Sequence, residues 1–223
     1  MKKKILVACL CVALAVLTIA GTTLAYLTSQ DTVTNTFTVG NVQITLDEAQ
    51  VNADGKPINK DGTVVADLAD AERVQKNSYK LIPGHTYTKD PMVTVLEGSE
   101  SSYIKMTVTF SKAAELDAIF APNGADMTSI FTGYNADNWI AKGNTKDTAA
   151  NTRTYEFWYK ETVAAPTANV ALDALFDSIT VPGSITNTQL ATIANMTITV
   201  NAYAIQADGF ATPEAAWAAY AAA

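Results

Sequence analysis

The chain has one histidine, His85, and this limits the metal chemistry that its side chains could support. A catalytic zinc ion normally takes about three protein ligands, largely histidines. The sequence contains no H-E-x-x-H pattern and no second histidine to share a metal. His85 follows Pro83 and Gly84, a pair typical of a type II turn. We therefore interpret it as an exposed loop residue and expect no bound metal or other cofactor.

Residues for nucleophilic or acid–base catalysis are also sparse. A Ser-His-Asp triad would have to use His85, and no G-x-S-x-G elbow is present. The sequence leaves a Ser-Lys dyad open but points to no pair of residues. Glycosidase carboxylates are recognised by their separation in space, and the adjacent Asp47 and Glu48 are more simply explained as solvated surface charge. We expect no catalytic residues and a protein that is not an enzyme.

Two Asp-Gly pairs indicate turns rather than a calcium site. Asn52, Asp54 and Gly55 resemble part of an EF-hand loop. That alignment puts Gln50 first and Asp61 last, where the pattern requires Asp and Glu. We expect an inserted hairpin or surface loop over residues 50–70.

The N-terminus has the features of a secretory signal peptide. Lysines at 2–4 precede an uncharged apolar run over residues 5–20. Thr23 and Ala25 are small residues at the positions that a signal peptidase reads, so cleavage is predicted between Ala25 and Tyr26. The alternative of a retained membrane anchor fits less well, because the apolar run is shorter than the roughly 20 residues that span a bilayer.

Cleavage would leave an acidic chain without cysteines. Cys9 and Cys11 lie inside the predicted leader, and Cys9 also ends a lipobox-like stretch that lies too close to Lys4 to function as one. The remaining chain would carry 12 basic and 22 acidic residues, a net charge of −10. This composition excludes disulfides and argues against nucleic acid or an anionic membrane as partner. We expect a protein in the extracellular matrix or on the cell surface, without stable membrane insertion after cleavage.

The patterning of the mature part predicts one β-domain. The clearest strand covers residues 103–110, where Ile104, Met106, Val108 and Phe110 face one side. Further strands are expected at 32–39, 42–46, 79–82, 86–96, 138–141, 153–159, 179–181 and 196–205. We predict an all-β fold, a jelly-roll-type antiparallel β-sandwich with a few short helices.

Three helices are expected between these strands. One begins after Ser111 as N-cap and runs to residue 120, and a second covers residues 169–176. The third opens at Pro213 and continues into the alanine-rich C-terminus. Trp217 and Tyr220, three residues apart, would dock this C-terminal helix on the sandwich.

Cleavage would free residues 26–46, which have the residue pattern of a β-strand. This segment has no required partner strand within its own chain. Its candidate polymerisation residues are Leu27, Val33, Phe37, Val39, Val42 and Ile44. Adding this segment to the sheet edge of a second copy pairs its backbone groups and buries its apolar side chains. Such a head-to-tail contact does not close and yields filaments. The alternative is that the segment folds into its own sheet and gives a monomer.

The chain is thus divided into a leader (1–25), a candidate donor strand (26–46) and a sandwich domain with a C-terminal helix (47–223).

Three sequence blocks resemble the TasA/camelysin family. The first spans the predicted cleavage site and first strand, from Ala25-Tyr26-Leu27-Thr28 to Val42. The second is Leu81-Ile82-Pro83-Gly84 followed by Lys89-Asp90-Pro91, and the third runs from Ile198 to Phe210 with Trp217 beyond it. The resemblance implies a jelly-roll fold, export through a dedicated signal peptidase, and assembly into biofilm-matrix fibres by donor-strand exchange.

Three functions therefore stand side by side at this point. The first is a fibre subunit, with other copies of the chain and the signal peptidase as partners and an accessory matrix protein as a further one. The second is a secreted binding module, with Trp139, Trp158 and Tyr159 as candidate contacts. The third is a metalloprotease, a historical label of one branch of the family that a single histidine supports poorly.

Overall fold

The computed structural model describes residues 40–121 and 130–222. These residues belong to one compact unit that spans Val39–Ala223. The predicted leader and residues 26–39 of the candidate donor segment lie outside the described residues.

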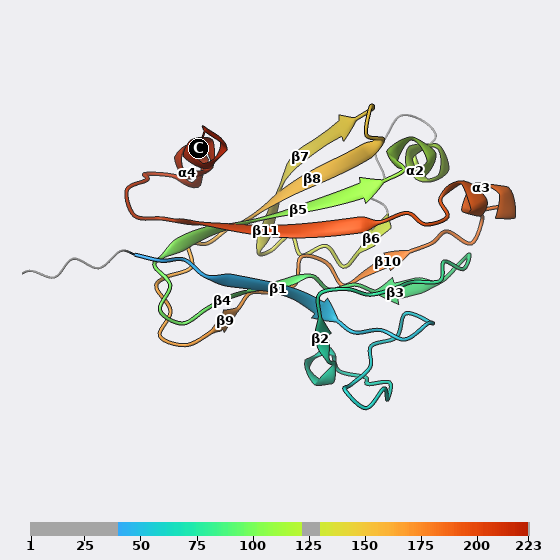
Figure 1. Cartoon of the computed structure of the whole chain (residues 1–223), viewed down its shortest axis with the longest axis horizontal. Helices are drawn as coiled ribbons and strands as arrows, with labels where there is room; N and C mark the ends of the chain where they lie inside the picture. Colours follow the sequence, from blue (N-terminus) through green and yellow to red (C-terminus); the bar gives the residue numbers. More distant parts are fainter. Residues whose placement is uncertain (1–39, 122–129, 223) are drawn as a thin grey trace, which may run out of the picture. The chain divides into compact units, whose positions relative to one another are not determined.

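Three antiparallel sheets form the body of this unit (Figure 1). The first has the order β2-β1-β4-β9, formed by Arg73–Val74, Ile44–Ala49, Met92–Val95 and Val170–Ala171. The second has the order β3-β10-β6, formed by Thr86–Thr88, Ser178–Thr180 and Phe131–Thr132. The third has the order β11-β5-β8-β7, formed by Ile198–Gln206, Ser102–Ser111, Thr152–Tyr159 and Trp139–Asp147. The predicted all-β sandwich with short helices is confirmed.

One core lies between the long sheet and the two smaller ones. The predicted inward face of β5 is confirmed, since Ile104, Met106, Val108 and Phe110 are each 0% exposed. They join one buried cluster with Val93 and Val95 of β4, Tyr87 of β3 and Ile179 of β10. Period-2 alternation thus places one face of β5 in the core, as a half-buried strand requires.

The region after β1 forms two small turns of identical design. Asn52 Oδ1 accepts hydrogen bonds from the amides of Asp54 and Lys56, each at 3.0 Å. Asn59 Oδ1 accepts in the same way from Asp61 and Thr63, at 3.1 and 2.9 Å. Each turn ends on a glycine with positive φ, as turn chemistry requires. A 3-10 helix η1 (Leu68–Asp70) then leads into β2.

Four sequence predictions about local structure are wrong. Residues 79–82 form no strand, because tyrosine side chains rather than a neighbouring strand hold this segment. Residues 169–176 form no helix, because Leu172 N donates to Val93 O and Leu175 N donates to Pro91 O instead of to the preceding turn. The expected strand over 86–96 is two strands, broken where Lys89 and Asp90 turn into the interior.

The N-cap assigned to Ser111 is the fourth error. Ser111 is the last residue of β5, and its hydroxyl accepts from Thr197 N at 2.8 Å. Helix α2 (Ala113–Phe120) is capped from outside, where Asn151 accepts from the amides of Ala113 and Ala114.

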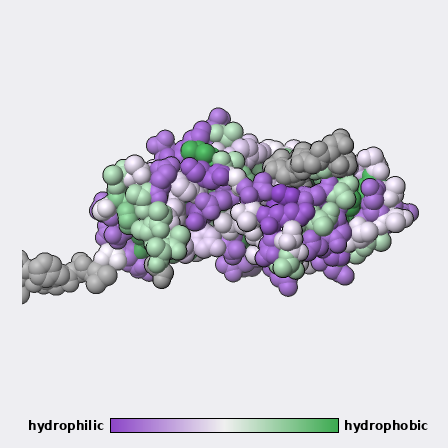
Figure 2. Space-filling view, turned by 90° about the horizontal axis from the view of Figure 1, so that it is seen from above, coloured by the Kyte–Doolittle hydropathy of each residue, from purple (hydrophilic) through white to green (hydrophobic). Residues whose placement is uncertain are grey.

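Two further helices complete the unit. Helix α3 (Asn187–Thr192) follows a capping box between Thr186 and Gln189. Helix α4 (Pro213–Ala222) is the predicted C-terminal helix, and Thr212 Oγ1 accepts from Ala215 N at its start. Trp217 is 4% exposed and packs on Trp158, which confirms that it docks α4 on the long sheet. Figure 2 shows the pale-green alanines of α4 gathered at one end of the molecule.

Candidate functional site: a groove between two strand edges

A groove of about 900 Å³ lies between β1 and the N-terminal half of β11. This volume is at the upper end of the range of ~300–1,000 Å³ that ligand sites occupy. Its walls come from β1, the segment after β2, β11 and the end of α3 (Figure 1). Apolar lining residues include Leu46, Leu81, Ile179, Leu190, Met196, Ile198 and Val200.

The edge of β11 that borders this groove has no strand hydrogen-bonded to it among the described residues, although β1 lies close by. β11 pairs only with β5, in register from Ile198↔Phe110 to Gln206↔Ser102. Ser111 N donates to Thr197 O at one end of this ladder, and Ala207 N donates to Ser101 O at the other. Odd-numbered residues of β11 therefore bond to β5, and the amides of even-numbered residues such as Val200 point away from it.

The edge of β1 is open in the same way over part of its length. β1 pairs with β4 from Ile44 to Asp47, but with β2 only at Glu48 and Ala49. Leu96 N donates to Gln43 O, which places odd-numbered residues on the β4 side. The backbone groups of Ile44 and Leu46 therefore point to the opposite side, where no described strand pairs with them. Two open strand edges thus border one groove, and a single added strand could pair with either.

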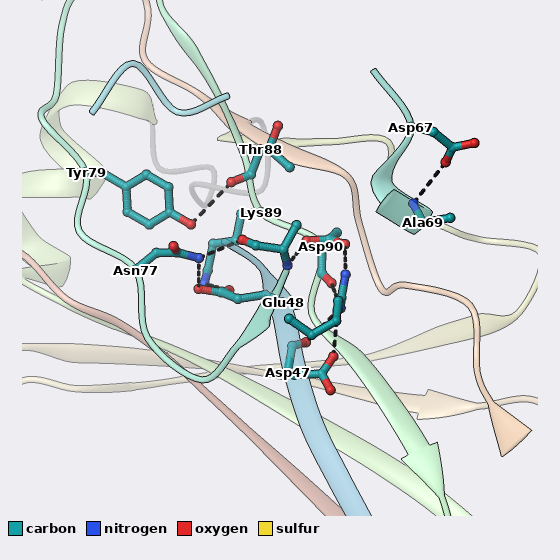
Figure 3. A network of polar contacts seen from close by, with 11 residues as sticks. Asp47, Glu48, Asp67, Ala69, Asn77, Tyr79, Thr88, Lys89 and Asp90 are labelled. Carbon is teal, nitrogen blue, oxygen red and sulfur yellow. Dashed lines mark hydrogen bonds and ion pairs between the residues drawn. The ribbon is translucent and has the colours of Figure 1, made fainter. Parts of the chain in front are cut away.

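One part of the groove lining is a network of buried polar side chains (Figure 3). Lys89 is 4% exposed, and its Nζ forms an ion pair with Glu48 Oε2. Asn77 Nδ2 donates to Glu48 Oε1 at 2.9 Å. Tyr79 OH donates to Thr88 O at 3.2 Å, and burial together with the nearby Glu48 charge raises the pKa of this phenol. A carboxylate, an amide, a phenol and an ammonium thus lie together in the lining of a groove that also has apolar walls.

A second ion-pair network holds β1 and β2 together behind the groove. Arg73 Nε donates to Asp47 Oδ1 at 2.8 Å, and Arg73 Nη1 donates to Asp90 Oδ2 at 2.5 Å. Burial opposes the charge on Arg73, but hydrogen bonds to the two carboxylates outweigh it and raise the pKa of the guanidinium. Asp90 Oδ1 also accepts from Ala49 N at 2.8 Å. The interpretation of Asp47 and Glu48 as solvated surface charge is wrong, because both carboxylates are paired and Glu48 is 8% exposed.

The remaining wall, residues 75–81, is held by side chains. No backbone–backbone hydrogen bond of these residues occurs within the described part of the chain. Asn77 fixes the segment to β1 and its continuation, accepting from Val51 N at 3.0 Å and donating to Ala49 O at 2.8 Å. Tyr87 OH bonds to Lys80 O and accepts from Ile82 N at 2.7 Å. This wall therefore keeps unused backbone donors and acceptors beside the groove.

Only some of the predicted site residues are among the residues that the structure describes. Ala25, Tyr26, Leu27, Val33, Phe37 and Val39 lie outside the described residues. Ile44 lies in β1, where it pairs with Val95 of the same chain, and Val42 precedes this strand. β1 therefore crosses the boundary placed between residues 46 and 47. The sequence patterns did not indicate a site at Glu48, Asn77 and Lys89. The one usable signal of burial was that Lys89 and Asp90 interrupt a predicted strand with apolar residues on both sides.

The residues that could hold a metal do not come together in the described ranges. No group of three or more His, Cys, Asp and Glu side chains is placed to bind one there. His85 is exposed after the turn at Gly84, as predicted, and its ring packs 6.1 Å from that of Tyr87. The turn itself is confirmed by the positive φ of Gly84 and by a 3.1 Å bond from His85 N to Ile82 O. The donor set around His85 therefore does not fit a protease metal centre.

The aromatic residues considered for a binding face are mostly occupied. Trp139 is 1% exposed, and its indole donates to Asp173 O at 3.0 Å. Trp158 is half-buried, with Lys142 Nζ 4.0 Å from its ring centre and Trp217 packed beside it. Tyr159 packs on Trp139 at 5.1 Å. These contacts weaken the hypothesis of an aromatic binding surface.

Comparison with known families adds one finding about the N-terminal part. Residues 1–65 match the camelysin metallo-endopeptidase family. This match confirms the predicted resemblance to the TasA/camelysin family. The camelysin match covers the predicted leader, the candidate donor segment, β1 and most of the two small turns. No curated protein and no solved structure matches the chain. No helix in the described ranges is long and apolar enough to cross a membrane.

Proposed function

We propose that this protein is an exported structural subunit that assembles head to tail into extracellular fibres. The N-terminal segment of one copy, residues 26–39, enters the groove between β1 and β11 of the next copy. The observation that carries this proposal is the pair of open strand edges that border one apolar groove. Strand addition to such an edge satisfies backbone groups and buries alternate side chains.

The other open edge of the long sheet is less suited to accept a strand. β7 carries a register irregularity between Ala141 and Gly143, and Lys142 and Lys146 project from it. Bulges and lysines are common protections against unwanted strand pairing. The groove edge of β11 has an unbroken register over its nine residues. Assembly through β11 therefore leaves β7 as a protected edge.

The start of the described chain favours pairing between copies. Glu100 N donates to Asn41 O at 2.8 Å, and Gln43 N donates to Ser99 Oγ at 3.0 Å. These bonds hold the chain extended from Asn41 into β1, so a fold-back into the same groove would have to turn before Gly40. The camelysin match spans both the candidate donor segment and β1, which supports treating them as one functional unit.

Electron microscopy of two altered chains tests the proposal. Deleting residues 26–37 removes the donor segment, and Val200→Pro removes one outward amide of β11 without removing a bond to β5. Both changes are expected to abolish filaments, whereas Val200→Ile, which keeps the amide, is expected to form them. Equal filament formation by the deleted and unaltered chains would contradict the donor-strand mechanism.

A further inference from the structure

We infer that Glu48 and Lys89 select an uncharged hydrogen-bonding side chain on the strand that enters the groove, and thereby fix its register. The occupant is the segment of residues 32–38 from a second copy of the chain. This inference rests on the proposed function and adds the chemical rule by which the groove would recognise its partner.

The first observation is the incomplete bonding of a buried ammonium. An ammonium has three N–H donors, but the Nζ of Lys89 has Glu48 Oε2 as its one hydrogen-bond partner among the described residues. Lys89 lines the groove and its side chain is 5% exposed. Buried donors without acceptors are costly, so an oxygen atom brought by a ligand would stabilise this part of the groove.

The second observation is the charge balance of the same cluster. Glu48 and Lys89 neutralise one another, and Asn77 adds an uncharged amide. The nearby Asp47 carboxylate is already paired with Arg73. A charged side chain that entered here would lose its hydration without gaining a counter-ion from this pair, and the other lysine of the groove lining, Lys76, is exposed to solvent. A hydroxyl or amide would instead accept from Lys89 at no cost in buried charge.

The candidate donor segment has the matching composition. Residues 32–39 contain no ionisable side chain, and threonine occupies every even-numbered position, with Val33, Asn35, Phe37 and Val39 between the threonines. The hydrogen-bonding members are Thr32, Thr34, Asn35, Thr36 and Thr38. Only one of them can lie opposite Lys89 in a given register, because successive residues of a strand are ~3.3 Å apart. Val33, Asn35 and Phe37 share one face of a strand, because successive side chains point to opposite faces. The register that places Val33 and Phe37 in the apolar part of the groove therefore places Asn35 toward Lys89.

A specificity switch tests this inference. Five synthetic peptides of residues 26–39 each have one of these polar residues replaced by aspartate. They and the unaltered peptide are titrated against the secreted chain that lacks residues 26–37, in which no copy can fill the groove of another, and peptide fluorescence reports binding. With Glu48 and Lys89 in place, this protein should bind one aspartate peptide about tenfold more weakly than the unaltered peptide. Glu48→Gln leaves Lys89 as an unneutralised cation, so it should reverse this preference for that same peptide. The double variant Glu48→Met with Lys89→Met should remove the discrimination.

The outcomes separate this inference from the proposed function. If the unaltered peptide does not bind the secreted chain at all, the fibre mechanism fails. If the unaltered peptide binds, but the Glu48→Gln variant binds none of the aspartate peptides more tightly than the unaltered peptide, the selection rule fails and the fibre mechanism stands. Should Glu48→Gln not fold, persistent discrimination by the double methionine variant overturns the inference on its own. Glu115→Gln, on α2 outside the groove lining, is the matched control and should leave every affinity unchanged.

Discussion

Asp117 on α2 is a carboxylate whose protonation should affect the stability of this domain. Its Oδ2 accepts from Lys146 at 2.8 Å and from Arg153 at 2.5 Å. Burial raises the pKa of this carboxyl, but the hydrogen bonds and charges of the two basic residues outweigh burial and lower it below 3.8. The ionised form is therefore favoured by folding, and this contribution is present above the unfolded pKa and is lost as pH falls through the folded pKa.

Asp117→Asn should lower the free energy of unfolding by about 1–3 kcal/mol near neutral pH. The difference between the two proteins should shrink as pH falls from about 6 toward 2, because the unaltered carboxyl then takes up its proton. Chemical denaturation at several pH values measures this. Asp137→Asn, at an exposed turn, is the control. A difference that stays constant over this pH range would contradict the assignment.

The two matched turns after β1 offer a comparison between two glycines. Gly55 and Gly62 have φ values of +75° and +79°. A Cβ on Gly55 would lie 2.3 Å from Tyr87 Cδ1, whereas a Cβ on Gly62 would have no atom within 4 Å. Gly62→Ala should cost ~1–2 kcal/mol for the left-handed backbone alone. Gly55→Ala should cost ~1–3 kcal/mol more through overpacking, as thermal unfolding of both variants would show. Equal costs would mean that Tyr87 can move aside.

At the scale of residues, the sequence predicts features that depend on neighbouring residues but not contacts between distant ones. The turn at Gly84 could be predicted, because Pro-Gly chemistry is local. The burial of Glu48 and Lys89 could not, because their pairing joins residues 41 positions apart. The N-cap of α2 was misassigned to Ser111 for the same reason, since Asn151 supplies the cap from the β7–β8 connection.

At the scale of elements, α4 depends on one buried side chain. Trp217 is the only large residue of α4 that is buried, and Lys105 Nζ lies 4.6 Å from its ring centre. Trp217→Ala should lower the free energy of unfolding by about 3 kcal/mol and release α4 from the sheet. Tyr220→Ala should cost less, because Tyr220 is 44% exposed. Denaturant unfolding with circular dichroism measures both, and an equal loss in the two variants would contradict this role of Trp217.

Helices and strands could be predicted where the spacing of their apolar residues matches the face that is buried in the fold. The sequences of β5 and β11 show a clear strand pattern, because one face of each strand packs against the core. Residues 169–176 carry helical spacing, but β4 offers their backbone a better set of partners. The sequence predicts only the start of β7, because residues 142–147 are polar or glycine and exposed and so carry no strand pattern. The groove lies between elements far apart in sequence, so no local pattern could indicate it.

At the scale of the whole molecule, the central claim is that the N-terminal segment of one copy pairs with β11 of another. The only cysteines are Cys9 and Cys11, so in a chain with both replaced by serine any disulfide must come from introduced residues. One cysteine replaces Ile198 in the groove, and a second is moved through positions 32–38 in turn. Non-reducing electrophoresis after mild oxidation of the secreted protein then reports which copy supplies the donor segment. We predict a ladder of covalent multimers at one or two neighbouring positions; a disulfide that forms only within monomers would contradict the account.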